Sequence, residues 1–255
     1  MQLPVNPLKR ALCEGRTQIG LWSMLSSHLT VEVVAGAGFD FLVLDMEHAP
    51  NELPMLHGQL QAMATGTATP VVRPPWNDAV AFKRLLDVGV QSFLVPFVQD
   101  AGEARRAVAA TRYPPLGVRG VAVASRANRY GRVTDYLQRA NDEICVHVQL
   151  ETRTAHANLE SIAAVEGVDG LFIGPSDLAA DMGHLGESGH PAVRAAIDDA
   201  LVRIQKTGKA AGILAPVEAD ARHWIELGAT FVAVGSDLGV LARQTEALAK
   251  KFKPQ

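Results

Sequence analysis

The chain has 255 residues, and its 24 lysines and arginines against 27 aspartates and glutamates give a formal net charge of −3. Apolar residues make up 48% and charged residues 20%, which excludes a disordered or fibrous chain. The near-neutral charge argues against a nucleic-acid-binding protein, which usually carries a basic stripe.

Eight short apolar runs, rich in valine, isoleucine, leucine and phenylalanine, recur along the chain. Their apolar residues do not alternate with polar ones, which is typical of parallel strands buried on both faces. Segments with helical periodicity separate several of these runs. The predicted strands cover residues 18–22, 39–44, 69–73, 91–96, 144–150, 170–173, 211–214 and 230–234. The predicted helices cover residues 79–86, 101–111, 155–165, 193–206, 217–227 and 238–252.

Eight strands alternating with about eight helices predict an α/β fold, a (β/α)8 TIM barrel. The alternative is an open doubly wound sheet, which the lack of a G-x-G-x-x-G after the first strand disfavours. Residues 113–141 are rich in arginine and glycine and lack an apolar period. We expect a long loop there, with short helical pieces and a functional or interfacial role. With no repeat and no linker, residues 1–255 are expected to form a single domain.

Nothing in the sequence indicates export or membrane insertion. Cys13 and Cys145 lie far apart and lack metal-ligand spacing, so we expect neither a disulfide framework nor a zinc ribbon. The longest uncharged stretch, residues 54–72, contains Gln, Thr, Gly and His, and residues 1–16 have no apolar signal core. We therefore expect a reduced, cytoplasmic, soluble protein.

Active sites of such barrels lie at the carboxyl ends of the strands. Polar residues cluster at or just after the ends of the second, third, fifth and sixth predicted strands, and Trp22 stands at the end of the first. We therefore expect these residues to share one pocket. They are Asp45, Glu47 and His48, then Arg73, then Gln149 and Glu151, and finally Ser176 and Asp177.

Glu151 and Asp177 follow strands that would be neighbours in the barrel. Two carboxylates converging in a pocket repel each other unless a cation lies between them. Oxygen ligands without cysteine favour Mg²⁺ or Mn²⁺ over Zn²⁺. The alternative is structural: Asp177 caps the following helix and Glu151 pairs with Arg153.

His48 and Arg73 are candidates for proton transfer and charge stabilisation. A histidine at a strand end can act as a general base near neutral pH; the alternative is a surface loop histidine. The other seven histidines are expected to have no polar partner nearby. Arg73 must meet an anion or a carbonyl oxygen because an unpaired buried charge is costly. Its alternative is a structural ion pair with Asp45 or Asp87.

Two strand-to-helix turns could bind anions through backbone N–H groups. Residues 174–177 suit a carboxylate or phosphate, and residues 235–237 keep a phosphorylated substrate open. A Schiff-base mechanism is rejected because no lysine stands at a predicted strand end. No G-x-S-x-G elbow is present either.

Six motifs together resemble the class II pyruvate aldolases of the HpcH/HpaI type, and the resemblance runs from about residue 20 to residue 249. They are LDMEHAP at 44–50, PVVRP at 70–74, LDVG at 86–89, RYPP at 112–115 with GVRG at 117–120, VQLET at 148–152 and GLFIGPSDL at 170–178. Met46 and Ser176 depart from the small residue and the alanine that the family favours at these positions, and neither departure should alter the chemistry.

The resemblance implies a role for each pocket residue. Glu151 and Asp177 hold a divalent Mg²⁺, Mn²⁺ or Co²⁺, which pyruvate chelates, while the backbone at Ser176 and Asp177 holds the pyruvate carboxylate. Arg73 contacts the keto oxygen. The remaining roles are proton transfer by His48, its orientation by Asp87, and shaping of the site by Gln149, Asp45 and Trp22.

The family's activity is the reversible cleavage of 4-hydroxy-2-oxo acids to pyruvate and an aldehyde. The expected substrate is 4-hydroxy-2-oxoheptanedioate, which gives succinic semialdehyde in aromatic catabolism. Alternatives are aldolases for 2-dehydro-3-deoxyglucarate or 2-keto-3-deoxyrhamnonate, a CoA-ester lyase, or a non-catalytic metabolite-binding barrel. The resemblance also implies a homohexamer, a trimer of dimers, with the last helix exchanged between subunits.

Overall fold

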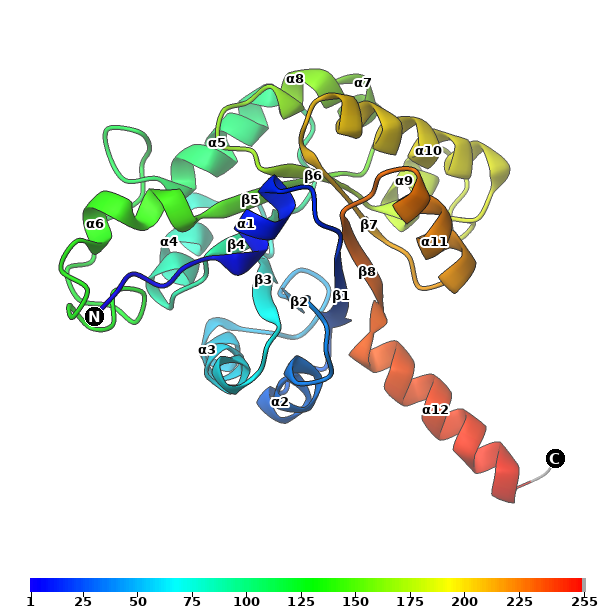
Figure 1. The fold of residues 1–255 in the computed structure, drawn as a ribbon. Coiled ribbons are helices and arrows are strands. Elements are labelled where there is room, and N and C mark those ends of the chain that lie inside the picture. The colour runs from blue at the N-terminus through cyan, green and yellow to red at the C-terminus, as the bar shows by residue number, and fades with distance from the viewer. Residues whose placement is uncertain (254–255) are drawn as a thin grey trace.

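Eight parallel strands close into a barrel in the computed structural model, which describes residues 1–253 (Figure 1). Each strand pairs with the next in the chain, and β8 pairs with β1. The predicted barrel is confirmed, and the closure between β1 and β8 excludes the open sheet. The strands are β1 Gln18–Ser23, β2 Phe41–Asp45, β3 Thr69–Arg73, β4 Ser92–Val95, β5 Cys145–Leu150, β6 Gly170–Ile173, β7 Ala210–Leu214 and β8 Phe231–Ser236.

Helices surround the barrel, as expected for a chain that alternates strand and helix. The predicted helix over 155–165 is two short helices that meet at Asn158. Helices α1, α2 and α3 were not predicted; α2, for example, buries only Val31 and Ala35, too few for a clear period. The helices are α1 Pro7–Cys13, α2 His28–Ala35, α3 Leu53–Ala62, α4 Ala79–Asp87, α5 Ala101–Thr111, α6 Tyr136–Arg139, α7 Arg153–Ala157, α8 Leu159–Ala163, α9 Pro175–Asp181, α10 Pro191–Lys206, α11 Glu218–Glu226 and α12 Asp237–Phe252, with short 3-10 helices η1 Met63–Thr65 and η2 Ala140–Glu143.

Aromatic rings fill the inside of the barrel. Phe41 and Phe231 have ring centroids 4.2 Å apart, and Phe172 lies 5.8 Å from Phe231. Glycine makes room for them: a Cβ on Gly20 would lie 2.3 Å from the Phe41 ring. Leu8 of α1 packs against the same cluster, so α1 closes the end at which the strands begin. A larger apolar layer lies between the barrel and its helices.

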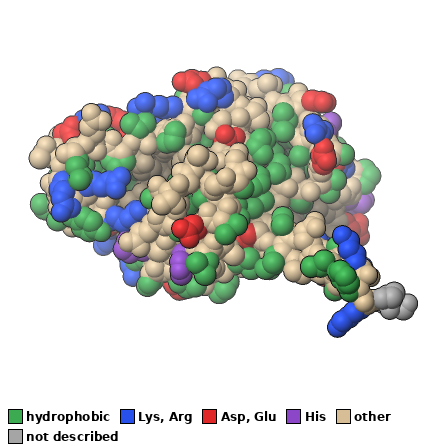
Figure 2. All heavy atoms as spheres, turned by 60° about the horizontal axis from the view of Figure 1, so that its bottom comes forward, with side chains coloured by type: hydrophobic (Ala, Val, Ile, Leu, Met, Phe, Trp, Pro, Cys, Tyr) green, Lys and Arg blue, Asp and Glu red, His purple; other side chains and the backbone are tan. Residues whose placement is uncertain are grey.

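Two segments depart from the compact barrel. Residues 112–135 form a long loop followed by the short α6 and η2, which confirms the prediction of an irregular segment. Helix α12 projects away from the barrel, and Asp237 is its only buried residue (Figures 1 and 2). Within residues 1–253, no helix has the length and apolar character needed to cross a membrane.

Candidate active site

A cavity of about 420 Å³ opens at the carboxyl ends of the strands. The structure thus brings together most of the residues that the sequence singled out, each placed by the end of its strand. Those that line the cavity are Trp22, His48, Arg73, Gln149, Glu151, Ser176 and Asp177.

Arg73 is held rigidly at the end of β3. Its Nε and Nη2 donate to the two carboxylate oxygens of Asp45 at 2.8 and 2.6 Å. The two residues stand side by side because Asp45 pairs with Arg73 in the β2–β3 register. The Trp22 indole N–H donates to Asp45 at 3.2 Å, and the guanidinium lies 4.9 Å from the Trp22 ring centroid. The structural ion pair between Arg73 and Asp45 is therefore present, and it fixes the arginine whose side chain lines the cavity.

Burial and charge compete at this pair. Burial alone would raise the pKa of the Asp45 carboxyl, but the hydrogen bonds and charge of Arg73 outweigh it, and the net shift is downward. Desolvation would lower the pKa of Arg73, yet Asp45 and Glu47 raise it. Both groups are therefore charged near neutral pH, and the cavity wall carries a fixed positive charge.

Glu151 is almost fully buried at the end of β5. One carboxylate oxygen accepts the side-chain amide of Gln149 at 2.8 Å, and the other accepts the backbone N–H of Phe97 at 2.9 Å. Desolvation by burial, with a smaller contribution from the nearby charge of Asp177, raises the pKa of Glu151 to about 7. The carboxylate lies against Gly174, where an added Cβ would stand 2.5 Å from Oε1.

The donor set around Glu151 fits a hard divalent cation. The charges of Asp177 and Glu47 contribute to raising the pKa of Glu151, and burial likewise raises the pKa of Glu47. Arg73 reaches Glu47 Oε2 at 2.8 Å, without the alignment of a hydrogen bond, so this buried oxygen stays unsatisfied, as does Oε1 of Gln149. Two carboxylates, those of Glu151 and Asp177, line the cavity together with the free amide oxygen of Gln149, and oxygen ligands of this type are the ones that Mg²⁺ and Mn²⁺ prefer.

The structural alternatives for the two acids are not observed. Arg153 pairs with Asp181 at 3.1 Å and not with Glu151. The N-cap of α9 is Gly174, and Asp177 lies within the first turn of the helix and does not cap it.

His48 and Asp87 do not meet within the described chain. The His48 side chain is half exposed, and its Nε2 lies 3.9 Å from a Glu47 oxygen. Asp87 ends α4, does not line the cavity, and has Arg119 as its ion-pair partner at 3.9 Å. No hydrogen bond joins His48 to Asp87 within residues 1–253, so their predicted pairing has no support from this geometry.

The turn after β8 serves the scaffold. Asp237 accepts the backbone N–H groups of Met24 and Leu25 at 2.8 and 3.3 Å, together with the Ser23 hydroxyl at 3.0 Å. This buried carboxylate fixes the chain that follows β1. Because it places negative charge beside Ser236, the turn is unfavourable for a phosphate.

Comparisons with known proteins show the family of the chain. A family model described as HpcH/HpaI aldolase/citrate lyase matches residues 18–244. The chain belongs to this family. It is an enzyme, an aldolase of the lyase class.

Similar proteins cover nearly the whole chain. The 4-hydroxy-2-oxo-heptane-1,7-dioate aldolases of Escherichia coli and Salmonella arizonae are each 58% identical, over 98% and 97% of this chain and 96% and 94% of theirs. A HpcH/HpaI aldolase/citrate lyase family protein from Burkholderia cenocepacia has a TM-score of 0.94 at 40% identity, covering 97% of this chain and 99% of its own. The HpcH/HpaI aldolase from Desulfitobacterium hafniense has a TM-score of 0.90 at 30% identity, covering 97% of both chains.

Two parts of this aldolase site had no predicted role. Glu47 was noted after the second strand, but its place beside Arg73 depends on the turn in which Asp45 accepts the N–H groups of Glu47 and His48. The backbone N–H of Phe97 could not be recognised from the sequence, because every residue except proline has one. Phe97 has a φ of +51°, a left-handed conformation that sequence patterns do not reveal. No lysine lines the cavity among the described residues, in keeping with the rejection of a Schiff base.

Proposed function

We propose that the chain cleaves 4-hydroxy-2-oxoheptanedioate reversibly to pyruvate and succinic semialdehyde, as a step in the catabolism of aromatic compounds in the cytoplasm. The observation that carries this proposal is the 58% identity, over nearly the full chain, to aldolases named for that substrate. The alternatives, sugar-acid aldolases of the same family, are not favoured by these relatives.

Cleavage moves one proton and one electron pair. A base removes the proton of the C4 hydroxyl, the C4–O bond becomes the aldehyde carbonyl, and the C3–C4 bond breaks. Its electrons form the enolate of pyruvate, whose C3 then takes up a proton to become the methyl group. The step is redox-neutral, so the residues must stabilise one oxyanion and transfer one proton.

Arg73 is the proposed partner of the C2 oxygen. Its guanidinium is fixed by Asp45 and Trp22 and lines the cavity, so it requires no reorganisation as negative charge develops. Electrostatic stabilisation by preorganised donors of this kind is the largest single contribution to the rate enhancement of many enzymes. Asp45 and Trp22 act by positioning Arg73.

His48 is the proposed group for proton transfer with the C4 hydroxyl. It lines the cavity, and its half-exposed ring can exchange protons with water. General-base catalysis of this type contributes about 10²–10⁴-fold. Orientation of His48 by Asp87 remains part of the proposal, and it would require a contact that a single chain does not make.

Glu151 and Asp177 are the proposed ligands of the divalent ion, Mg²⁺, Mn²⁺ or Co²⁺. When bound, such an ion acts as a Lewis acid on the keto oxygen of the substrate. Gln149 orients Glu151 by donating to its carboxylate. The N–H groups of Ser176 and Asp177, in the first turn of α9, are free to receive the pyruvate carboxylate.

A product assay tests the proposal. Purified protein with Mn²⁺ should release pyruvate from 4-hydroxy-2-oxoheptanedioate, measured by coupling to lactate dehydrogenase, and EDTA should abolish the release. A strong preference for tartronate semialdehyde as the acceptor in the reverse reaction would favour a sugar-acid aldolase. Turnover of a malyl thioester would favour a CoA-ester lyase, and pyruvate binding without cleavage would favour a binding protein.

We also propose that the chain forms a homohexamer, a trimer of dimers, in which α12 is exchanged between two subunits. Val240, Leu241 and Phe252 of α12 are exposed. An apolar depression of about 560 Å³ lies beside the start of this helix, lined by Leu29 and Val33 of α2 among others. A sixteen-residue helix with one buried residue gains little stability from its own chain, so a second copy is the natural cover.

Sedimentation tests this assembly. The wild-type chain should sediment as a hexamer, while Leu241→Glu together with Val33→Glu should give smaller species that keep the barrel's circular dichroism. A wild-type chain that sediments as a monomer at micromolar concentration would contradict the proposal.

A further inference from the structure

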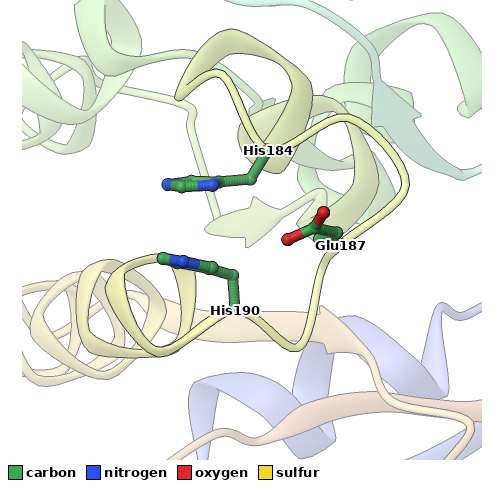
Figure 3. Close-up of side chains that lie close together, drawn as sticks. All are labelled: His184, Glu187 and His190. Atoms are coloured by element: carbon green, nitrogen blue, oxygen red, sulfur yellow. The ribbon is translucent and has the colours of Figure 1, made fainter.

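Three side chains with metal-ligating atoms meet in the turn between α9 and α10, outside the catalytic cavity. Ligand atoms of His184, Glu187 and His190 all lie within 4.8 Å of one another. The two imidazole rings are stacked, with centroids 3.6 Å apart and planes inclined by 16° (Figure 3). Both histidines are partly buried, and Glu187 is exposed. We expected no polar partner for these histidines, and that expectation was wrong.

The backbone builds this cluster by a regular series of turns. The N–H of Glu187 donates to the carbonyl of His184 at 2.9 Å, and the N–H of His190 donates to the carbonyl of Glu187 at 2.8 Å. The i, i+3, i+6 spacing therefore places the three side chains together. Gly183 and Gly186 have φ values of +85° and +80°, which other residues adopt only at a cost. The turns therefore bring the three side chains together before any ligand arrives, and rotation of the rings out of their parallel stack would then direct both imidazoles at one ion.

His190 already makes one contact at this place. An imidazole nitrogen is a common ligand of divalent transition metals, and the two rings lie close together. Nδ1 of His190 accepts the N–H of Ala192 at 3.2 Å, as the N-cap of α10. A metal ion on either nitrogen of His190 removes this hydrogen bond, because Nδ1 then holds the metal or carries the proton. Water can then accept the exposed N–H of Ala192 instead.

We propose that His184, Glu187 and His190 form a second metal site, which binds a borderline divalent transition metal such as Zn²⁺. Two imidazoles and one carboxylate suit Zn²⁺, Ni²⁺, Co²⁺ or Cu²⁺, whereas Mg²⁺ prefers oxygen ligands alone. The two proposed metal sites of the chain therefore select different ions. The second site does not depend on whether the proposed substrate is correct. An ion bound here ties together the turn that links α9, the helix of Asp177, to α10.

Zn²⁺ binding in saturating Mg²⁺ tests the proposal, measured by equilibrium dialysis and metal analysis. Wild type should retain one Zn²⁺ per chain that the double variant His184→Gln, His190→Asn loses; asparagine keeps the N-cap of α10. Asp177→Asn should keep this Zn²⁺. The matched control His223→Gln removes another histidine that contacts a carboxylate, Asp198 at 3.2 Å, and should also keep it.

A second readout is spectroscopic. Co²⁺ added to Asp177→Asn should show d–d absorption bands that are absent from the same protein carrying the two histidine substitutions. Equal Zn²⁺ stoichiometry in wild type and the double variant would overturn the proposal. An equal loss in His223→Gln would also overturn it, because it would indicate unspecific binding to surface histidines.

Discussion

The proposed binding of a divalent ion by Glu151 predicts an affinity that depends on pH. Burial, with help from Asp177 and Glu47, raises the pKa of this carboxyl to about 7. A metal ligand must be deprotonated, so the ion and a proton compete for the same carboxylate. Since ionisation of Glu151 is what permits binding, affinity should rise with pH up to about 7 and then level off.

The size of the effect follows from that pKa. With a pKa of about 7 for Glu151, competition from the proton weakens the binding of the ion by a factor of about 11 at pH 6 and about 1.1 at pH 8. The Kd for Mn²⁺ should therefore be about tenfold weaker at pH 6 than at pH 8, which is about 1.4 kcal/mol. Binding should release about 0.9 proton per ion at pH 6 and about 0.1 at pH 8.

Calorimetric titration of Mn²⁺ in two buffers of different ionisation enthalpy measures both quantities. Asp181→Asn is the matched control: it removes a carboxylate from the same helix as Asp177, but one that pairs with Arg153 on the surface. That variant should keep the wild-type profile, as should His48→Gln, which removes the histidine that lines the cavity. An affinity that stays constant from pH 6 to 8 without proton release would refute the role given to Glu151.

Two further predictions concern Arg73 and its partner Asp45, and a third concerns the rejected Schiff base. Asp45→Asn should destabilise the protein by about 3 kcal/mol in urea titrations, because it removes one partner of a buried ion pair; the exposed Asp135→Asn should leave the midpoint unchanged, and equal losses would contradict this account. Arg73→Lys keeps the charge but loses the paired contact to Asp45, so kcat should fall about 100-fold; a normal kcat would remove Arg73 from the mechanism. Borohydride with pyruvate should leave the protein mass unchanged, and a mass increase on a lysine would reverse the choice of mechanism.

The barrel was predictable because its signal is local and repeated. Each strand is an apolar run bounded by polar residues, and a parallel strand buried on both faces needs nothing more specific. The pocket residues were predictable for the same reason: the end of every strand reaches the same face, so Arg73, Glu151 and Asp177 could be assigned to one site from position alone.

Contacts that depend on loops were not predictable. The position of Glu47 is set by a turn around Asp45, and the donor from Phe97 is a backbone N–H in a left-handed residue. The meeting of His184 with His190 depends on glycine turns whose φ angles leave no mark in the periodicity. In each case the deciding quantity is a backbone angle, whereas the sequence displays only side chains.

Gly174 restricts how this enzyme can be re-engineered. Any side chain at that position would occupy the volume already taken by the Glu151 carboxylate, so even alanine would displace Oε1 of Glu151. Mutant libraries aimed at new aldehydes should therefore leave it unaltered. Diversity is better introduced at Leu214, the last residue of β7, and at Pro216, which line the same cavity without supporting an acidic group.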